Sequence, residues 1–238
     1  MSYEALQQMV DGSHKIVFFG GAGVSTESGI PDFRSTDGLY RQKYDYPPET
    51  ILSRTFFDRN PKEFYRFYRA KMLVLDKKPN PAHLKLAQWE KEGRLLGIVT
   101  QNIDGLHQAA GSERVFELHG SIHRNYCMRC RKFYAPEYIR DAEDAVPHCS
   151  CGGIIKPDVV LYEEGLDQDV LSGAVHALSK ADMLIVAGTS LTVYPAAGLV
   201  RYFNGKHLVL INRDPTPMDS SCDLVIHDSV GKVLGSLA

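Results

Sequence analysis

The chain has 238 residues, of which 44% are hydrophobic and 24% are charged. This length can bury a sizeable core, in one large domain or in one domain with a small insert. The formal net charge is −2, from 27 basic and 29 acidic residues, so there is no electrostatic basis for binding nucleic acid through its backbone.

The N-terminal residues 1–12 (MSYEALQQMVDG) lack the basic start and apolar centre of a targeting segment, and they predict a short helix that ends at Gly12. The longest uncharged stretch, residues 183–200, contains Gly188 and Pro195, so it predicts a strand, a loop and a helix start and not a membrane span. We therefore expect a cytoplasmic protein without membrane contact. Nothing in the sequence indicates association, so we expect a monomer.

Residues 15–35 read KIVFFGGAGVSTESGIPDFRS, an apolar strand at 16–19 followed by a glycine-rich turn. Such glycines let the main chain approach a phosphate closely, and the N–H groups of a following helix can hold the anion. The dinucleotide spacing G-x-G-x-x-G is not met, so the glycines alone also fit an ordinary strand-to-helix turn. The Pro-Asp-Phe-Arg that follows Ile30 has no use in core packing and favours a functional loop.

Further strand-like runs occur at 95–100, 183–187, 208–211 and 224–226, with helical patterns between several of them. One helix is expected over PKEFYRFYRAKMLVL, starting on Pro61 behind Asn60, and another over PAHLKLAQWEKEG, starting on Pro81 behind Asn80. Buried strands that alternate with helices predict a Rossmann-like, doubly wound parallel sheet, an α/β fold. Ligands of such sheets bind beyond the carboxyl ends of the strands.

Two segments interrupt this alternation. We expect a helical module at about 35–78 and a zinc-ribbon module at about 122–157, which together form a small second lobe. The Rossmann-like part then comprises about 1–34, 79–121 and 158–238 of a single catalytic domain over 1–238.

Four of the five cysteines are clustered, which favours a metal site in a reducing compartment over a disulfide framework. Cys127 and Cys130 form one pair, and Cys149 and Cys151 follow after a loop of zinc-ribbon length. Four thiolates close a tetrahedral shell around zinc and leave no position for water or substrate, so the ion would be structural. Because the second pair is unusually tight, His148 is an alternative ligand.

Four sequence blocks occur in order: GAGVSTESGIPDFR, TQNIDGLHQAAG at 100–111, ELHGS at 117–121 and GTSLTVYPAAG at 188–198. With the cysteine cluster between the second and the fourth, they closely resemble the sirtuin family of NAD-dependent protein deacylases, from about residue 15 to 237. The resemblance implies acetylated proteins or peptides as substrates, NAD as a consumed cosubstrate and a structural zinc ion.

The resemblance also implies the residues of the site. His119 aligns with the general base, and Asn102 with the residue that holds the nicotinamide ribose and a bound water. Asp104 would accept a hydrogen bond from the nicotinamide carboxamide, and the carbonyl of Val160 one from the acyl-lysine amide. Phe33 would shield the ribose C1′. The other positions implied to contact NAD are Ala22, Thr26, Arg34, Gln101, Ile103, Thr189, Ser190, Asn212 and Val230.

In the mechanism that the resemblance implies, the acyl oxygen attacks the ribose C1′, nicotinamide leaves, and the acyl group ends on ADP-ribose. The peptide would lie as an added strand between 159–164 and the segment from Leu191. We expect acetyl or another apolar acyl group to be preferred over succinyl, because Tyr65 is followed three positions later by Tyr68 and not by arginine. Two alternatives use the same residues: an ADP-ribosyltransferase or NAD glycohydrolase, and a non-enzymatic NAD or peptide sensor.

Overall fold

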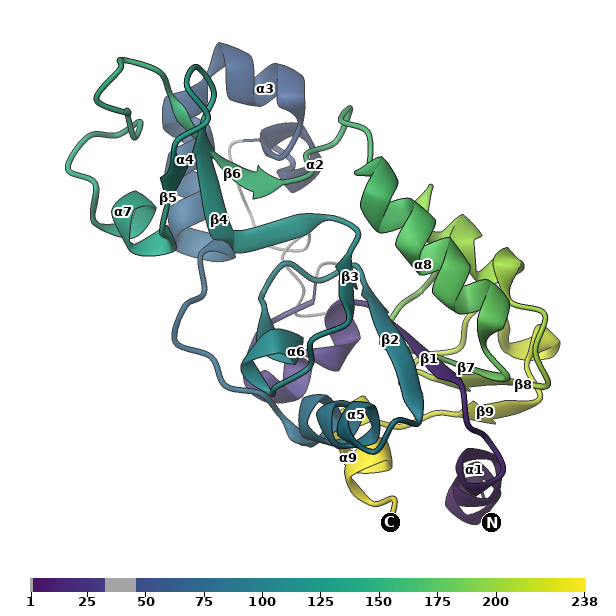
Figure 1. The fold of residues 1–238 in the computed structure, drawn as a ribbon. Helices are drawn as coiled ribbons and strands as arrows, with labels where there is room; N and C mark the ends of the chain where they lie inside the picture. Colours follow the sequence, from purple (N-terminus) through teal and green to yellow (C-terminus); the bar gives the residue numbers. More distant parts are fainter. Residues whose placement is uncertain (1, 33–45) are drawn as a thin grey trace.

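The computed structural model describes residues 2–32 and 46–238, which form a larger α/β part and a smaller lobe (Figure 1). The larger part is built on a six-stranded sheet in the order β3-β2-β1-β7-β8-β9, whose neighbouring strands all pair in parallel. The strands are β1 (Ile16–Gly20), β2 (Leu95–Thr100), β3 (Val115–Glu117), β7 (Met183–Ala187), β8 (His207–Ile211) and β9 (Leu224–Ile226).

Helices cover both faces of this sheet, which explains why β1 and β7 are buried at all five of their positions. One face packs against α1 (Ser2–Asp11), α5 (Pro81–Lys91) and α9 (Val230–Gly235). The other face packs against α8 (Gln168–Lys180) and the 3₁₀ segment η5 (Ala196–Tyr202). Figure 1 shows α8 on the opposite side of the sheet from α5 and α9. The predicted doubly wound α/β fold is confirmed.

Two helix starts follow the predicted capping chemistry. The Asn80 side chain accepts from the main-chain N–H of Ala82 at 2.9 Å, and His83 Nδ1 accepts from the N–H of Asn80 at 3.2 Å, with Pro81 at the first helical position. Asn60 similarly accepts from the N–H of Glu63 at 3.3 Å at the start of α4 (Pro61–Phe67).

That helix, α4 (Pro61–Phe67), is shorter than the sequence predicted. The expected continuous helix changes at Tyr68 into a π-helical turn, η4 (Tyr68–Met72), which closes with a bond from the N–H of Leu73 to the carbonyl of Tyr68 at 2.9 Å. Tyr65, in α4, and Tyr68, at the start of the π-helical turn, are both fully buried. Tertiary packing therefore overrides the local helical pattern at this point.

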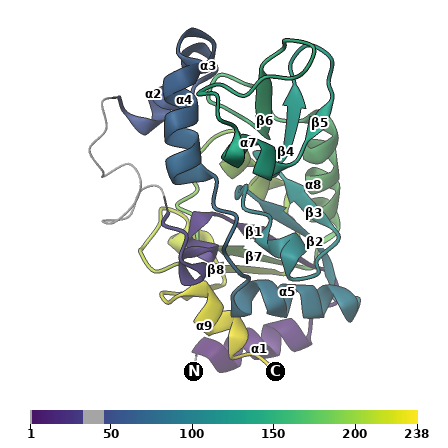
Figure 2. The same ribbon diagram turned by 90° about the vertical axis from the view of Figure 1, so that its left-hand side faces the viewer.

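The smaller lobe joins α2 (Pro48–Ile51), α3 (Arg54–Arg59) and α4 to an antiparallel sheet in the order β5-β4-β6, with α7 (Pro136–Asp141) at its edge (Figures 1 and 2). The strands are β4 (Gly120–Cys127), β5 (Phe133–Tyr134) and β6 (Ile155–Val159). Phe57, Phe64 and Tyr65 pack in one core with Ile122 and Ile155, so the helices and the small sheet are stabilised together. The domain boundaries remain predictions; the one expected between 121 and 122 falls inside β4.

Short helical turns complete the fold: η1 (Ala22–Val24), η2 (Thr26–Ser28), α6 (Leu106–Ala109) and η6 (Asp219–Ser221). In the described part of the chain, no helix combines the length and the apolar character that crossing a bilayer requires.

Candidate active site and metal centre

A cavity of about 380 Å³ opens at the carboxyl ends of the parallel strands, between the sheet and the smaller lobe. Nine of the predicted site residues line it: Ala22, Gln101, Asn102, Ile103, His119, Val160, Thr189, Ser190 and Asn212. Each follows a strand end, and residues after β1, β2, β3, β7 and β8 all contribute. Residues far apart in the sequence therefore converge on one space, although their roles remain predictions.

The remaining predicted residues lie elsewhere. Asp104 lines a smaller adjoining cavity of about 40 Å³, which shares Asn102 with the larger one. The Thr26 hydroxyl donates to the carbonyl of Gly23 at 3.0 Å, and the Val230 side chain is buried in the core beneath the sheet. Phe33 and Arg34 lie outside the described residues.

The glycine turn after β1 is packed directly on the turn after β7. The N–H of Gly23 donates to the carbonyl of Gly188 at 2.8 Å, and Gly188 has a φ of 59°. A Cβ added at Gly188 would lie 2.4 Å from the main-chain nitrogen of Val24. Both turns therefore require glycine for close main-chain approach, and Gly23 and Gly188 both line the cavity. The N–H groups of these two glycines are used inside the fold, bonded to the carbonyls of Gly188 and Ile211.

His119 lies just beyond β3, with its imidazole held in one orientation. Its Nδ1 is 3.0 Å from the carbonyl oxygen of Gln101, and because a carbonyl can only accept, Nδ1 must carry the proton. Nε2 of the neutral ring is then free to accept a proton. Burial lowers the pKa of His119, partly opposed by the bond to Gln101, so the ring is neutral near pH 7. This arrangement suits a general base.

Ser25 connects the turn after β1 to the loop after β2, which carries the predicted nicotinamide residues, and the sequence analysis missed it. Its hydroxyl donates to Asp104 Oδ2 at 2.7 Å and accepts from Asn102 Nδ2 at 3.2 Å. The other Asp104 oxygen accepts from the N–H of Leu106 at 2.9 Å, at the start of α6. The position of Ser25 inside the GAGVSTESG block could have identified it, since the neighbouring residues were already assigned to the site.

The segment after β6, residues 160–164, forms a rim of the cavity, which residues 193–195 also line. The N–H of Val160 donates to the carbonyl of His119 at 2.9 Å. Glu164 follows in a turn in which its carboxylate accepts from Lys156 Nζ at 3.2 Å, Arg54 at 3.1 Å and the N–H of Leu161 at 2.8 Å. These contacts fix the rim to β6 and α3.

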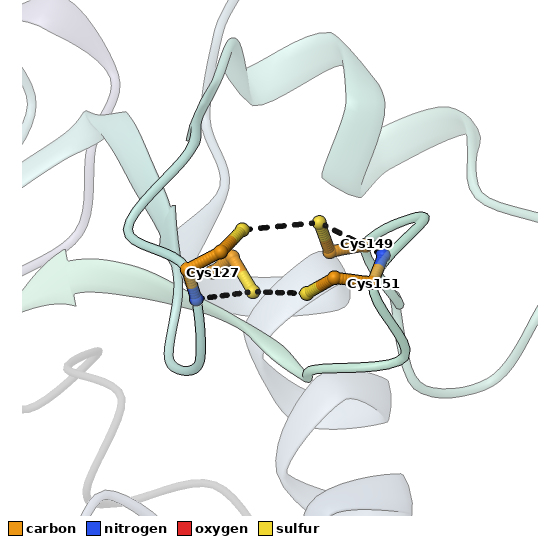
Figure 3. Close-up of side chains that lie close together, drawn as sticks. Cys127, Cys149 and Cys151 are labelled. Atoms are coloured by element: carbon orange, nitrogen blue, oxygen red, sulfur yellow. Dashed lines mark hydrogen bonds between the residues drawn. The ribbon is translucent and has the colours of Figure 1, made fainter.

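The four predicted cysteines form one cluster, with all their sulfur atoms within 4.8 Å of one another. Cys127 Sγ lies 3.5 Å from Cys151 Sγ, and Cys130 Sγ lies 3.6 Å from Cys149 Sγ. Figure 3 shows Cys127 on one loop facing Cys149 and Cys151 on the other. This donor set fits a tetrahedral zinc ion without a fifth ligand.

His148, the predicted alternative ligand, is not part of the cluster found among the described residues. It is exposed, its main chain pairs with Ile154, and its carbonyl accepts from the Tyr138 hydroxyl at 2.9 Å. The tight Cys149–Cys151 spacing is accommodated by a turn in which the N–H of Gly152 donates to the carbonyl of Cys149 at 2.8 Å.

The fold and the site define a Rossmann-like α/β protein with a polar cavity at its strand ends and a four-cysteine metal centre. A family model described as "Sir2 family" matches residues 21–195. A protein of Clostridium acetobutylicum named NAD-dependent protein deacetylase is 61% identical over 232 residues, covering 96% of this chain and 95% of its own length. A Clostridium perfringens protein of the same name is 59% identical over 98% of this chain and 96% of its own length.

Solved structures agree. A Sir2 variant with a deacetylated p53 peptide and 3′-O-acetyl ADP-ribose superposes with a TM-score of 0.90 at 40% identity, over 98% of this chain and 96% of that one. The chain belongs to the Sir2 family.

Proposed function

We propose that this chain removes acetyl groups from lysine side chains of proteins or peptides and consumes NAD in the reaction. The observation that carries the proposal is the neutral imidazole of His119, with Nε2 free, in the same cavity as Asn102 and Val160. Relatives named NAD-dependent protein deacetylase support it, as does the Sir2 structure that contains a deacetylated peptide and acetyl ADP-ribose.

NAD supplies the ribose carbon that accepts the acyl oxygen, and nicotinamide is its leaving group. Among the residues of the chain, His119 Nε2 takes a proton from a ribose hydroxyl, a role typically worth about 10²–10⁴ in rate. Asn102 and Gln101 bind ribose hydroxyls through their amides, and Asp104 accepts from the carboxamide. The main chain of Ala22, together with Thr189 and Ser190, holds the phosphates and the second ribose. Asn212 and the main chain of Val230 would complete the adenosine side.

The acetyl-lysine peptide binds as an extra strand between 159–164 and the loop from Leu191. The two segments line the same cavity. The N–H of Val160 donates to the carbonyl of His119, and within residues 2–32 and 46–238 no main-chain N–H donates to the Val160 carbonyl, which supports its predicted role as the acceptor of the acyl-lysine amide. Recognition through main-chain pairing tolerates many peptide sequences. Glu164 contributes little to peptide selection because Lys156 and Arg54 already neutralise it.

The acyl group is small or apolar. Arg69, which directly follows Tyr68, donates to the main-chain carbonyls of Ile139, Asp144 and Ala145 at 2.8, 3.0 and 3.2 Å. Arg66, between the two tyrosines, pairs with Glu63 at 2.6 Å. The Tyr65 hydroxyl donates to the carbonyl of Ile155. Arg69 and Tyr65 therefore hold the lobe together, and the Arg69 guanidinium is engaged by main-chain carbonyls and not available to an acyl carboxylate.

The decisive experiment incubates the purified protein with an acetyl-lysine peptide, with and without NAD, and follows the products by mass spectrometry. Deacetylated peptide and acetyl-ADP-ribose should form only with NAD, and His119→Ala should reduce their formation by at least ~10². Nicotinamide release with the acetyl group untouched would instead indicate ADP-ribosyl transfer or NAD hydrolysis. NAD binding without any turnover would indicate a sensor.

A further inference from the structure

Strand β4 contains an irregularity directly after the predicted general base. Ser121 pairs with Asp158 of β6, and the next paired residue, Asn125, is opposite Pro157. Three residues of β4, 122–124, therefore lie between two paired positions that are adjacent in β6, and they bulge out of the ladder. Bulges of this kind often lie beside active sites and redirect side chains. We call residues 122–124 the β4 bulge.

The first two residues of the β4 bulge bind the loop after β2. The N–H of Ile122 donates to the carbonyl of Ile103 at 3.0 Å. His123 Nε2 lies 2.9 Å from the carbonyl of Asp104, and so must donate to it. The His123 ring is packed tightly against the loop, because a Cβ added at Gly105 would lie 2.6 Å from the ring. The small lobe thereby holds the loop that carries the predicted nicotinamide residues.

The third residue, Arg124, joins three strands of two different sheets. Its Nη1 donates to Glu117 Oε2 at 2.6 Å, at the end of β3, and its Nε donates to Asp158 Oδ2 at 2.7 Å, in β6. The Glu117 side chain is only 8% exposed, and the Arg124 side chain is 38% exposed. A fork of donors suits two carboxylates at a fixed separation, which a lysine ammonium cannot reproduce.

The two carboxylates flank the residues proposed to do the chemistry. Glu117 is two positions before His119, and Asp158 is two positions before Val160. The N–H of Val160 donates to the carbonyl of His119 at 2.9 Å, so the residues that follow the two carboxylates by two positions are bonded to each other. We propose that Arg124 is a positioning residue that fixes His119 relative to the strand end that receives the acyl-lysine. This inference rests on the proposed roles of His119 and Val160.

The test compares Arg124→Met with Arg124→Lys and with a control, Arg114→Met. Arg114 also pairs with a largely buried carboxylate, Glu90, at 3.1 Å, but at the opposite end of β3 from the cavity. Each variant is assayed with acetyl-peptide and NAD at a temperature well below its unfolding midpoint, and rates are given per folded molecule from circular dichroism.

Arg124→Met should lower kcat/KM for the peptide by ~10-fold or more, since small misplacements of a catalytic group are costly. Arg124→Lys should be intermediate, because its ammonium keeps the charge but lacks the fork. Arg114→Met should stay within about twofold of the unchanged protein while lowering its unfolding temperature. A kcat/KM of Arg124→Met within about twofold of that of the unchanged protein would overturn the proposal, whatever the effect of the substitution on stability.

If Arg124→Met does not fold, Glu117→Gln tests the contact between Arg124 and Glu117 with a side chain of equal size. A fall in kcat/KM of ~10-fold or more would support the proposal. A value within about twofold of the unchanged protein would overturn it. The assay of His119→Ala separates the two levels of inference. Deacetylation retained by His119→Ala would mean that the site itself is misassigned, whereas loss in His119→Ala with full activity in Arg124→Met would remove only the positioning role.

Discussion

Ser25 and Asp104, 79 positions apart in the chain, are joined by a buried hydrogen bond of 2.7 Å from hydroxyl to carboxylate. The same hydroxyl accepts from Asn102 at 3.2 Å. The turn after β1 and the loop after β2 are therefore held together at the centre of the site. Asp104 and Asn102 are both predicted to contact NAD. The Ser25 hydroxyl therefore orients two NAD-binding side chains without a predicted NAD contact of its own.

Replacing Ser25 by alanine should weaken the reaction more than the fold. Leaving buried polar groups without their partner costs about 1–3 kcal/mol, so kcat/KM for NAD should fall by ~10-fold or more. Steady-state kinetics would measure this, with Ser179→Ala as control, because the exposed Ser179 hydroxyl donates to the carbonyl of His176 within α8, away from the cavity. Equal kinetics for the two variants would contradict the expectation.

The pH dependence of deacetylation should report His119. Only the neutral ring can accept a proton, and burial lowers its pKa below the ordinary value. The rate should therefore rise with pH through a midpoint below about 6.5 and be level at neutral pH. The measurement is kcat/KM for the peptide from pH 5 to pH 8 at constant ionic strength. A midpoint at or above the ordinary histidine value would be inconsistent with this account.

Stability should fall in mild acid because of two histidines that lie against each other below the sheet. The rings of His83 and His107 are 4.7 Å apart, and burial lowers the pKa of His83 to about 4 and that of His107 to about 3. The unfolded chain binds protons on both near pH 6.5, whereas the folded chain does not. The free energy of unfolding should then fall by roughly 1 kcal/mol per pH unit for each histidine below about pH 6.

Urea unfolding at pH 7.5 and pH 5.5 would measure this change, and those values lie above the range in which most carboxylates titrate. An equal free energy of unfolding at both pH values would show that the two histidines do not differ in protonation between the states.

Removal of the metal should unfold the smaller lobe before it affects the chemistry directly. Cys149→Ser should lose bound zinc and lower the unfolding temperature, since binding at a closed four-thiolate site contributes to folding. Zinc content by atomic emission and thermal unfolding are the measurements. Cys222→Ser is the matched control, because Cys222 lies outside the cluster and its thiol contacts the carbonyl of Met218. Retained zinc in Cys149→Ser would refute the ligand set.

Acetyl-lysine peptides should be turned over with at least ~10-fold higher kcat/KM than succinyl-lysine peptides, because a buried carboxylate without a partner is costly. Leu52, Met72 and Ile103 line the cavity on the side of the small lobe. Among the described lining residues the permanent cation is Arg213, whose guanidinium lies 3.4 Å from the Asp32 carboxylate. Paired assays with acetyl, propionyl and succinyl forms of one peptide test the preference, and a higher value for succinyl would contradict it.

Several elements could be predicted because their signals are local. The apolar runs that became β1, β2, β7, β8 and β9 are short and bounded by turn residues. Asn80 before Pro81 marks a helix start through hydrogen bonds within one turn. The metal centre could also be predicted from a local signal, because the two cysteines of each pair lie within a few residues of each other. Strand β3 was harder to identify because three residues have no period of their own and are stabilised by pairing with β2.

The sequence by itself determined the order of the blocks, the doubly wound sheet, the four cysteines and His119 as the candidate base. The tertiary structure decided that Ser25 meets Asp104, that Arg124 joins Glu117 to Asp158, and that Arg69 binds main-chain carbonyls. Tertiary packing also determines that α4 ends at Phe67 and continues as a π-helical turn. These outcomes depend on residues that are distant in the chain. A local pattern specifies the conformation of a segment, whereas packing between segments selects which side chains become partners.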